Sequence, residues 1–228
     1  MILLAIDTSG KDGGIALARA NQTSPEATSP GVEILDQVPL EGGTFSAQLV
    51  PQISGLLSRH GLSKSAIGGF AVVSGPGSFT GLRVGLAAIK ALAEILEKPV
   101  AAVSRLEAVA HSGESRGRVI AALDAGRNEV YSGEYHMQDR ARVLSERLVS
   151  RDEFFAEARG AAVVTPDSSL AEAARGAGLK VQEVAKPTSA AIARIGWQKI
   201  IRGETISPED LEANYIRRSD AEIFAKKS

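Results

Sequence analysis

A glycine-rich segment contains the residues best placed to bind an anion. Residues 75–81 read Gly-Pro-Gly-Ser-Phe-Thr-Gly and lie between an apolar run at 70–73 and an Ala- and Leu-rich run at 82–97. Phosphate-binding loops share this order of strand, glycine turn and helix, because the first N–H groups of a helix have no partner within it. The spacing is neither that of a Walker A loop nor Gly-x-Gly-x-x-Gly. The segment therefore predicts either an anion site or a structural turn.

A second segment, Asp7, Thr8 and Ser9, follows a strongly apolar run at residues 2–6. A carboxylate beside two hydroxyls can hold Mg²⁺ and phosphate in two-lobed nucleotide enzymes. The same residue types also commonly stabilise the turn in which they lie. We treat both segments as one candidate nucleotide or anion site. Its residues are Asp7, Thr8, Ser9, Gly75, Gly77, Ser78 and Thr80.

Composition argues against several other kinds of site. The chain has no cysteine, which rules out disulfides and thiolate metal sites and suits a cytoplasmic protein. His60, His111 and His136 share no ligand spacing, so we predict no metal site. The net charge of −1 disfavours binding of a nucleic-acid backbone by this chain alone. No apolar run is long enough to span a bilayer, so we expect no membrane partner.

The predicted elements occur in a duplicated order. Residues 2–103 read as β-β-β-α-β-α-β and residues 119–202 as β-β-β-α-β-α-β-α, and the first strand of each copy ends in an aspartate. This order predicts an α/β fold of two lobes, each a mixed sheet packed by helices. We expect residues 1–104 to form the first lobe and residues 105–228, with an extended tail, to form the second. We also expect a flexible loop at 21–31 and a third strand that ends at Pro39.

Two predicted helices in the first lobe, at about 44–60 and 82–97, have unusual surfaces. The first has no charged residue before Arg59. The second is apolar except for a narrow charged stripe. An exposed helix needs a much narrower apolar face, so both helices favour burial or a protein interface. The candidate interface residues are Phe45, Gln48, Gln52, Leu56, Arg83, Gly85, Ala88, Ala91 and Leu92.

Four segments of the chain resemble the TsaB family, also called YeaZ. They are residues 4–9, 75–85, 99–107 and 122–131, and the run Gly-Pro-Gly-Ser-Phe-Thr-Gly-Leu-Arg is specific to that family. The resemblance is strong up to Tyr131 and loose after it. It implies a duplicated actin-like (RNase H-like) fold and a cytoplasmic, non-catalytic subunit. Such a subunit works in the synthesis of N6-threonylcarbamoyladenosine (t6A) at position 37 of tRNAs that read ANN codons.

The resemblance also implies partners. They are the catalytic paralogue TsaD, as a heterodimer through the two helices above, and the ATPase TsaE. It further implies a homodimer when the chain is alone and tRNA contact only through the complex. Where TsaD holds its catalytic metal with an H-x-x-x-H pair, this sequence has Arg105 and Val109, which are not metal ligands. We therefore predict no catalytic residue.

The sequence departs from the TsaB pattern at the start of the first helix. The family usually has His-Ser-Glu there, whereas this chain has Phe45, Ser46 and Ala47, which removes a polar ring and a charge from the expected interface. No cofactor is firmly implied, although weak binding of ATP or ADP with Mg²⁺ at the complex interface stays open. The alternative functions are an actin-fold ATP-dependent phosphotransferase and a glycoprotease-like metallopeptidase.

Overall fold

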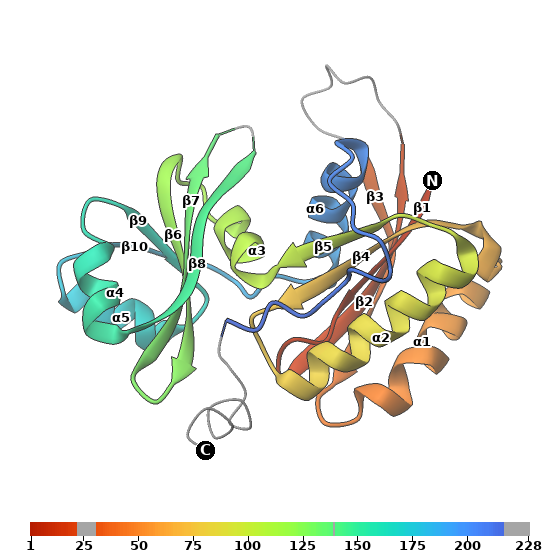
Figure 1. Ribbon diagram of the computed structural model, residues 1–228, viewed down its shortest axis with the longest axis horizontal. Coiled ribbons are helices and arrows are strands. Elements are labelled where there is room, and N and C mark those ends of the chain that lie inside the picture. Colours follow the sequence, from red (N-terminus) through yellow and green to blue (C-terminus); the bar gives the residue numbers. More distant parts are fainter. Residues whose placement is uncertain (22–30, 139, 217–228) are drawn as a thin grey trace. The chain divides into compact units, whose positions relative to one another are not determined.

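The computed structural model describes residues 1–21, 31–138 and 140–216, which form two units (Figure 1). Unit one comprises Met1–Ser104 and Thr188–Ala213, and unit two comprises Arg105–Pro187 and the described residues 214–216. The expected second lobe, residues 105–228, is therefore corrected, because residues 188–213 return to the first unit. Most of the expected loop at 21–31 lies outside the described residues.

Unit one is a five-stranded mixed sheet in the order β3-β2-β1-β4-β5. β1, β4 and β5 are parallel, whereas β2 pairs antiparallel with both β1 and β3. Its strands are β1 (Ile2–Asp7), β2 (Asp12–Ala20), β3 (Val32–Glu41), β4 (Ile67–Gly75) and β5 (Val100–Ser104). A short 3-10 turn, Lys64–Ala66, leads into β4. The parallel strands β1, β4 and β5 are mostly apolar and buried, which suits a sheet covered on both faces. The edge strand β3 is mixed in composition and mostly exposed or half-buried.

Helices cover both faces of this sheet. α1 (Phe45–Arg59) and α2 (Phe79–Leu96) pack beside each other on the face that carries Ile6. α6 (Ser189–Ile201) packs on the opposite face, where a Cβ built on Gly196 would come within 2.3 Å of the Ala71 Cβ. This contact is the physical reason for the corrected boundary, since α6 buries its apolar side chains, Trp197 among them, against the first sheet.

Unit two repeats the topology. Its sheet has the order β10-β9-β6-β7-β8, which is the same arrangement as unit one once the strands are numbered from the start of each copy. Its strands are β6 (Gly117–Gly126), β7 (Glu129–Met137), β8 (Ala141–Ser150), β9 (Ala162–Thr165) and β10 (Lys180–Glu183). α3 (Arg105–Ser112) packs on one face, and α4 (Arg151–Glu157) and α5 (Ser168–Gly176) pack on the other. The predicted duplication of an α/β sheet unit is confirmed.

Two element boundaries differ from the sequence prediction. β3 does not end at Pro39 but continues to Glu41. It is the edge strand of its sheet, where the missing N–H of a proline costs no ladder hydrogen bond. α2 begins at Phe79, three residues before the expected start, because Ser78 caps it by accepting a hydrogen bond from the Gly81 N–H.

Candidate functional site

The glycine-rich turn closes directly onto the end of β1. The Ser78 N–H donates to the Ser9 carbonyl at 2.7 Å, and the Thr8 hydroxyl donates to the Gly81 carbonyl at 2.8 Å. Thr8 and Ser9 are almost completely buried, at 2% and 1% exposed. The structure therefore brings together the two segments that the sequence singled out, and it joins them by hydrogen bonds between each other.

The glycines of this turn make room for the protein's own backbone. A Cβ on Gly77 would lie 2.2 Å from the Ser9 carbonyl oxygen, and a Cβ on Gly81 would lie 2.1 Å from the Thr8 carbonyl oxygen. Both distances are far below van der Waals contact, so only glycine fits. Gly75 has φ +131°, which also favours glycine. These glycines thus allow the turn to pack directly against the backbone at the end of β1.

The polar groups proposed for an anion are largely engaged within the turn. The Asp7 carboxylate accepts from the Ser9 N–H at 2.8 Å and from the Ser9 hydroxyl at 2.6 Å, which is the local turn-stabilising role of an aspartate. The Ser78 hydroxyl caps α2. Thr80 is exposed in the first turn of that helix. The geometry therefore favours a structural turn.

The two residues expected at the metal-ligand positions of TsaD, Arg105 and Val109, lie in α3. Val109 is fully buried in the apolar core of unit two, and Arg105 is half-buried at the helix start. Within the part of the chain that the structure describes, no group of three or more His, Asp or Glu side chains could hold a metal ion. His60 instead contacts Asp36 at 3.2 Å.

The outer surface of α2 carries a row of mainly uncharged side chains. These residues recur every four positions and therefore lie on one side of the helix. The row comprises Phe79, Arg83, Ala87, Ala91 and Ile95, all exposed. Ile95 is 72% exposed, and the Arg83 guanidinium lies over the Phe79 ring at 3.8 Å. Val50 on the neighbouring helix α1 is 66% exposed. We call these six residues the two-helix surface.

The predicted interface residues divide into two groups. One group is half-buried or exposed: Gln48, Gln52, Arg83, Ala88, Ala91 and Leu92. The other three are buried inside unit one: Phe45, Leu56 and Gly85. A Cβ on Gly85 would come within 2.3 Å of the Thr8 hydroxyl oxygen, so this glycine serves the contact between α2 and β1.

Sequence reasoning missed three apolar members of the two-helix surface, Phe79, Val50 and Ile95. The four-residue spacing from Phe79 to Ile95 was visible in the sequence. A helix that begins at Leu82 leaves Phe79 in the turn, whereas the observed start at Phe79 puts it first in the row.

Comparison with known proteins gives consistent results. The sequence model of the TsaD family, tRNA N6-adenosine threonylcarbamoyltransferase, matches residues 42–200. The chain is 27% identical over 234 residues to the tRNA threonylcarbamoyladenosine biosynthesis protein TsaB of Escherichia coli, covering 97% of this chain and 96% of that protein. It is 33% identical over 140 residues to TsaB of Bacillus subtilis, covering 61% of this chain. That second match spans 57% of the relative's own length.

A solved structure of similar shape is YeaZ from Pseudomonas aeruginosa. It superposes with a TM-score of 0.70 at 26% identity, covering 93% of this chain and 100% of that one. Among the described residues, no helix is long and apolar enough to cross a membrane.

Proposed function

The chain belongs to the TsaD family and, within it, to TsaB (YeaZ), and on that basis we propose that it is a non-catalytic subunit in the synthesis of t6A in tRNA. Its partner in this proposal is TsaD, which it binds as a heterodimer, and TsaE joins the pair. The complex acts on A37 of tRNAs that read ANN codons, in the cytoplasm.

The observation that carries the proposal is the two-helix surface. Phe79, Val50 and Ile95 expose apolar area that a single helix packed on a sheet has no reason to expose. Ala87 and Ala91, which lie between them, allow another backbone to approach closely. An apolar patch with few charges is typical of a surface that a protein partner covers. In the isolated chain, the same patch favours a homodimer.

The closed glycine-rich turn supports a non-catalytic role. An actin-fold phosphotransferase would use the hydroxyls and carboxylate near Asp7 on Mg-ATP, but Thr8 and Ser9 are buried and already hydrogen-bonded. A metallopeptidase would need metal ligands where Arg105 and Val109 lie. Weak binding of ATP or ADP with Mg²⁺ at the complex interface stays a secondary prediction.

Reconstitution tests the proposal. Unmodified tRNA would be incubated with threonylcarbamoyl adenylate and TsaE, together with this chain alone, TsaD alone, or both, and t6A would be measured by mass spectrometry of the nucleosides. We expect efficient modification only with both proteins, and co-elution of the two in size-exclusion chromatography. Robust t6A formation by this chain alone would overturn the non-catalytic role. If TsaD forms the same amount of t6A with and without this chain, the proposed function is overturned.

A further inference from the structure

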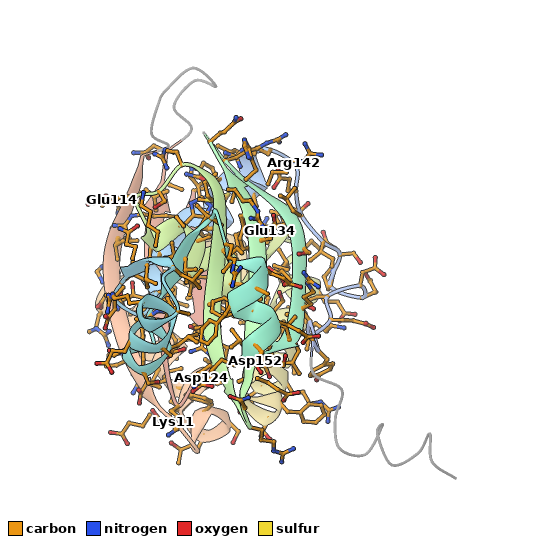
Figure 2. The ribbon with its side chains drawn as sticks, turned by 90° about the vertical axis from the view of Figure 1, so that its left-hand side faces the viewer. Lys11, Glu114, Asp124, Glu134, Arg142 and Asp152 are labelled. Carbon is orange, nitrogen blue, oxygen red and sulfur yellow. The ribbon has the colours of Figure 1, made fainter. Side chains whose placement is uncertain are left out.

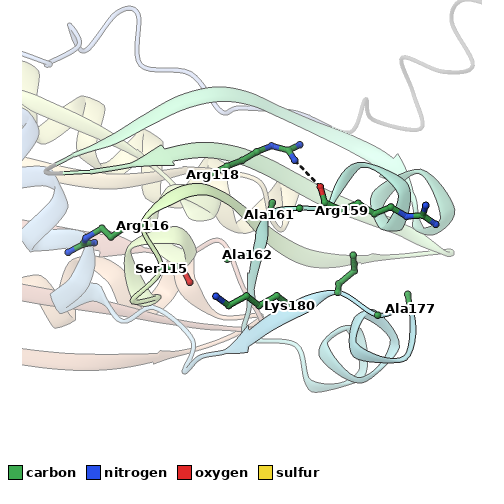
Figure 3. A pocket seen from close by; sticks show the side chains of 11 residues that line it. Ser115, Arg116, Arg118, Arg159, Ala161, Ala162, Ala177 and Lys180 are labelled. Carbon is green, nitrogen blue, oxygen red and sulfur yellow. Dashed lines mark hydrogen bonds between the residues drawn. The ribbon is translucent and has the colours of Figure 1, made fainter.

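A basic pocket lies at one edge of the sheet of unit two. Strands β6, β9 and β10 are parallel, so their amino ends meet at this edge, and the C-terminal ends of α4 and α5 close it. The pocket has a volume of about 630 Å³. Figure 3 shows Arg116, Arg118, Arg159 and Lys180 around it. None of the described residues that line it carries a carboxylate or an aromatic ring.

One of these four cations has a structural role. The Arg118 Nε donates to the Glu134 carboxylate at 2.7 Å. One terminal nitrogen donates to the Arg159 carbonyl at 3.1 Å (Figure 3). The other terminal nitrogen donates to the Glu157 carbonyl, also at 3.1 Å. Glu157 is the last residue of α4, and Arg159 lies two residues beyond it. A cation is favourable there because the last carbonyls of a helix lack partners within it.

The other three cations have no such role. Arg116, Arg159 and Lys180 are exposed, and none has a side-chain hydrogen bond or ion pair with any residue that the structure describes. The nearby acids are already used, since Glu134 pairs with Arg118 and Glu157 pairs with Arg147 at 2.8 Å. An adjoining hollow of about 350 Å³, which shares Lys180, adds one exposed carboxylate, Glu114. A surplus of positive charge therefore remains around a concave surface, where like charges repel one another unless an anion compensates them.

A further cation, Arg142, lies along the same edge. In the strand register, Arg118 lies opposite His136, and His136 lies opposite Arg142. Figure 2 shows Arg142 at one end of the sheet of unit two and Asp124 and Asp152 at the other. Glu114 and Glu134 are also labelled on the Arg142 side of Figure 2, so the local surplus of positive charge rests on the cations of the pocket themselves.

We propose that the pocket of Arg116, Arg159 and Lys180 binds the phosphate backbone of RNA, an inference that rests on the proposed function for the choice of RNA. Cations that reach phosphates position a nucleic acid without reading its sequence. The described lining residues offer no aromatic ring on which a base could stack, whereas their cations suit the phosphates of the backbone. Arg116, Arg159 and Lys180 come from three different segments around the pocket, which fits an extended polyanion better than a mononucleotide.

The test measures direct binding by the full chain, separately from modification. Fluorescence anisotropy of a labelled, unmodified tRNA transcript would be followed at several low salt concentrations. The pocket variant combines Arg116→Ala, Arg159→Ala and Lys180→Ala. The control variant combines Lys64→Ala, Arg194→Ala and Arg202→Ala, which removes the same charge from exposed positions of unit one.

We expect the pocket variant to bind the transcript about tenfold more weakly, and its slope of log K against log salt to fall in magnitude by about 2 to 3, one for each lost phosphate contact. The control variant should bind like wild type. Equal weakening of both variants, unchanged binding by the pocket variant, or no binding by wild type at low salt would overturn the proposal. Displacement of the transcript by ATP at millimolar concentration or below would also overturn it, because it would identify a mononucleotide site.

The reconstitution assay separates this inference from the proposed function. If the pocket variant binds RNA like wild type while the wild-type chain supports t6A formation, only the pocket assignment fails. If the pocket variant loses RNA binding while t6A formation does not depend on this chain, only the proposed function fails.

Discussion

The hydroxyl oxygen of Thr8 occupies the space that a side chain at Gly85 would need, since a Cβ built there would come within 2.3 Å of it. The same hydroxyl donates to the Gly81 carbonyl one helical turn earlier. These two contacts fix α2 against the end of β1. They also fix the direction in which the outer row of α2 faces, and that row is the part of the chain for which we propose a partner.

Replacing Gly85 with alanine tests this seating. In a helix interior, Gly→Ala usually stabilises by about 0.5 to 1 kcal/mol. At Gly85 the added methyl must displace Thr8 from a buried position, and overpacking of this kind costs about 1 to 3 kcal/mol. We therefore expect Gly85→Ala to lower the midpoint of urea unfolding.

Gly55 in α1 provides the matched control. A Cβ there meets nothing closer than the Arg59 Nη1 at 3.7 Å, which is an ordinary contact. Gly55→Ala should therefore raise the urea midpoint. If both alanine variants are stabilised, the close contact between α2 and β1 is not the reason for glycine at position 85.

The ion-paired carboxyl of Asp36 gives a prediction about pH. The hydrogen bond from the Arg59 guanidinium, at 2.8 Å, holds the pKa of Asp36 below its usual value, and His60 and the Gln37 N–H act in the same direction. A lowered pKa stabilises the fold above the unfolded-state pKa of about 3.9, and the contribution is lost as the pH falls through the folded-state pKa. Asp36→Asn should thus cost about 1 kcal/mol or less near pH 7.

The stability gap between wild type and Asp36→Asn should stay constant above about pH 5 and close as the pH falls below about 4. Urea unfolding at each pH measures it. Asp12→Asn is the control, because Asp12 has no side-chain hydrogen bond or ion pair with a described residue. A gap that widens toward acid would contradict the assigned sign.

The start of α4 depends on a reciprocal cap. The Ser150 hydroxyl accepts from the Glu153 N–H at 3.2 Å, and the Ser150 N–H donates to the Glu153 carboxylate at 2.8 Å. Ser150→Ala should destabilise unit two by about 1 kcal/mol, because a helix N–H loses its partner. Hydrogen exchange of the α4 amides measures this loss of stability.

Ser54→Ala is the control, because Ser54 lies on the exposed face of α1. It should change stability by less than about 0.5 kcal/mol. If Ser54→Ala and Ser150→Ala change stability equally, the Ser150 cap does not stabilise α4.

Much of the fold could be predicted from local patterns. The apolar strands and the duplicated element order follow from periodicity and from turn residues. The place of α6 could not be predicted, because an apolar helix after the second copy can cover either sheet. Its contact with Ala71 is a non-local packing choice.

The meaning of the candidate site was harder to predict. Gly77 and Gly81 signal that something approaches the backbone closely, but the sequence does not say whether it is a ligand or the protein's own chain.

The basic pocket could not be predicted from the sequence for a different reason. Arg116, Arg159 and Lys180 are far apart in the sequence, and only the parallel pairing of β6, β9 and β10 brings them to one edge.

Ala91→Glu tests whether this chain acts by pairing with a catalytic partner through the two-helix surface. Ala91 is exposed, so the variant should fold, yet a buried carboxylate in the interface has no partner. Ala156→Glu, on the exposed face of α4, is the matched control.

The measurement is t6A formation by a fixed amount of TsaD as the concentration of each variant is raised. Wild type and Ala156→Glu should saturate near one equivalent, whereas Ala91→Glu should need at least about tenfold more protein to reach the same plateau. An Ala91→Glu curve that overlays the wild-type curve, or one that lowers the plateau without shifting the midpoint, would contradict the account.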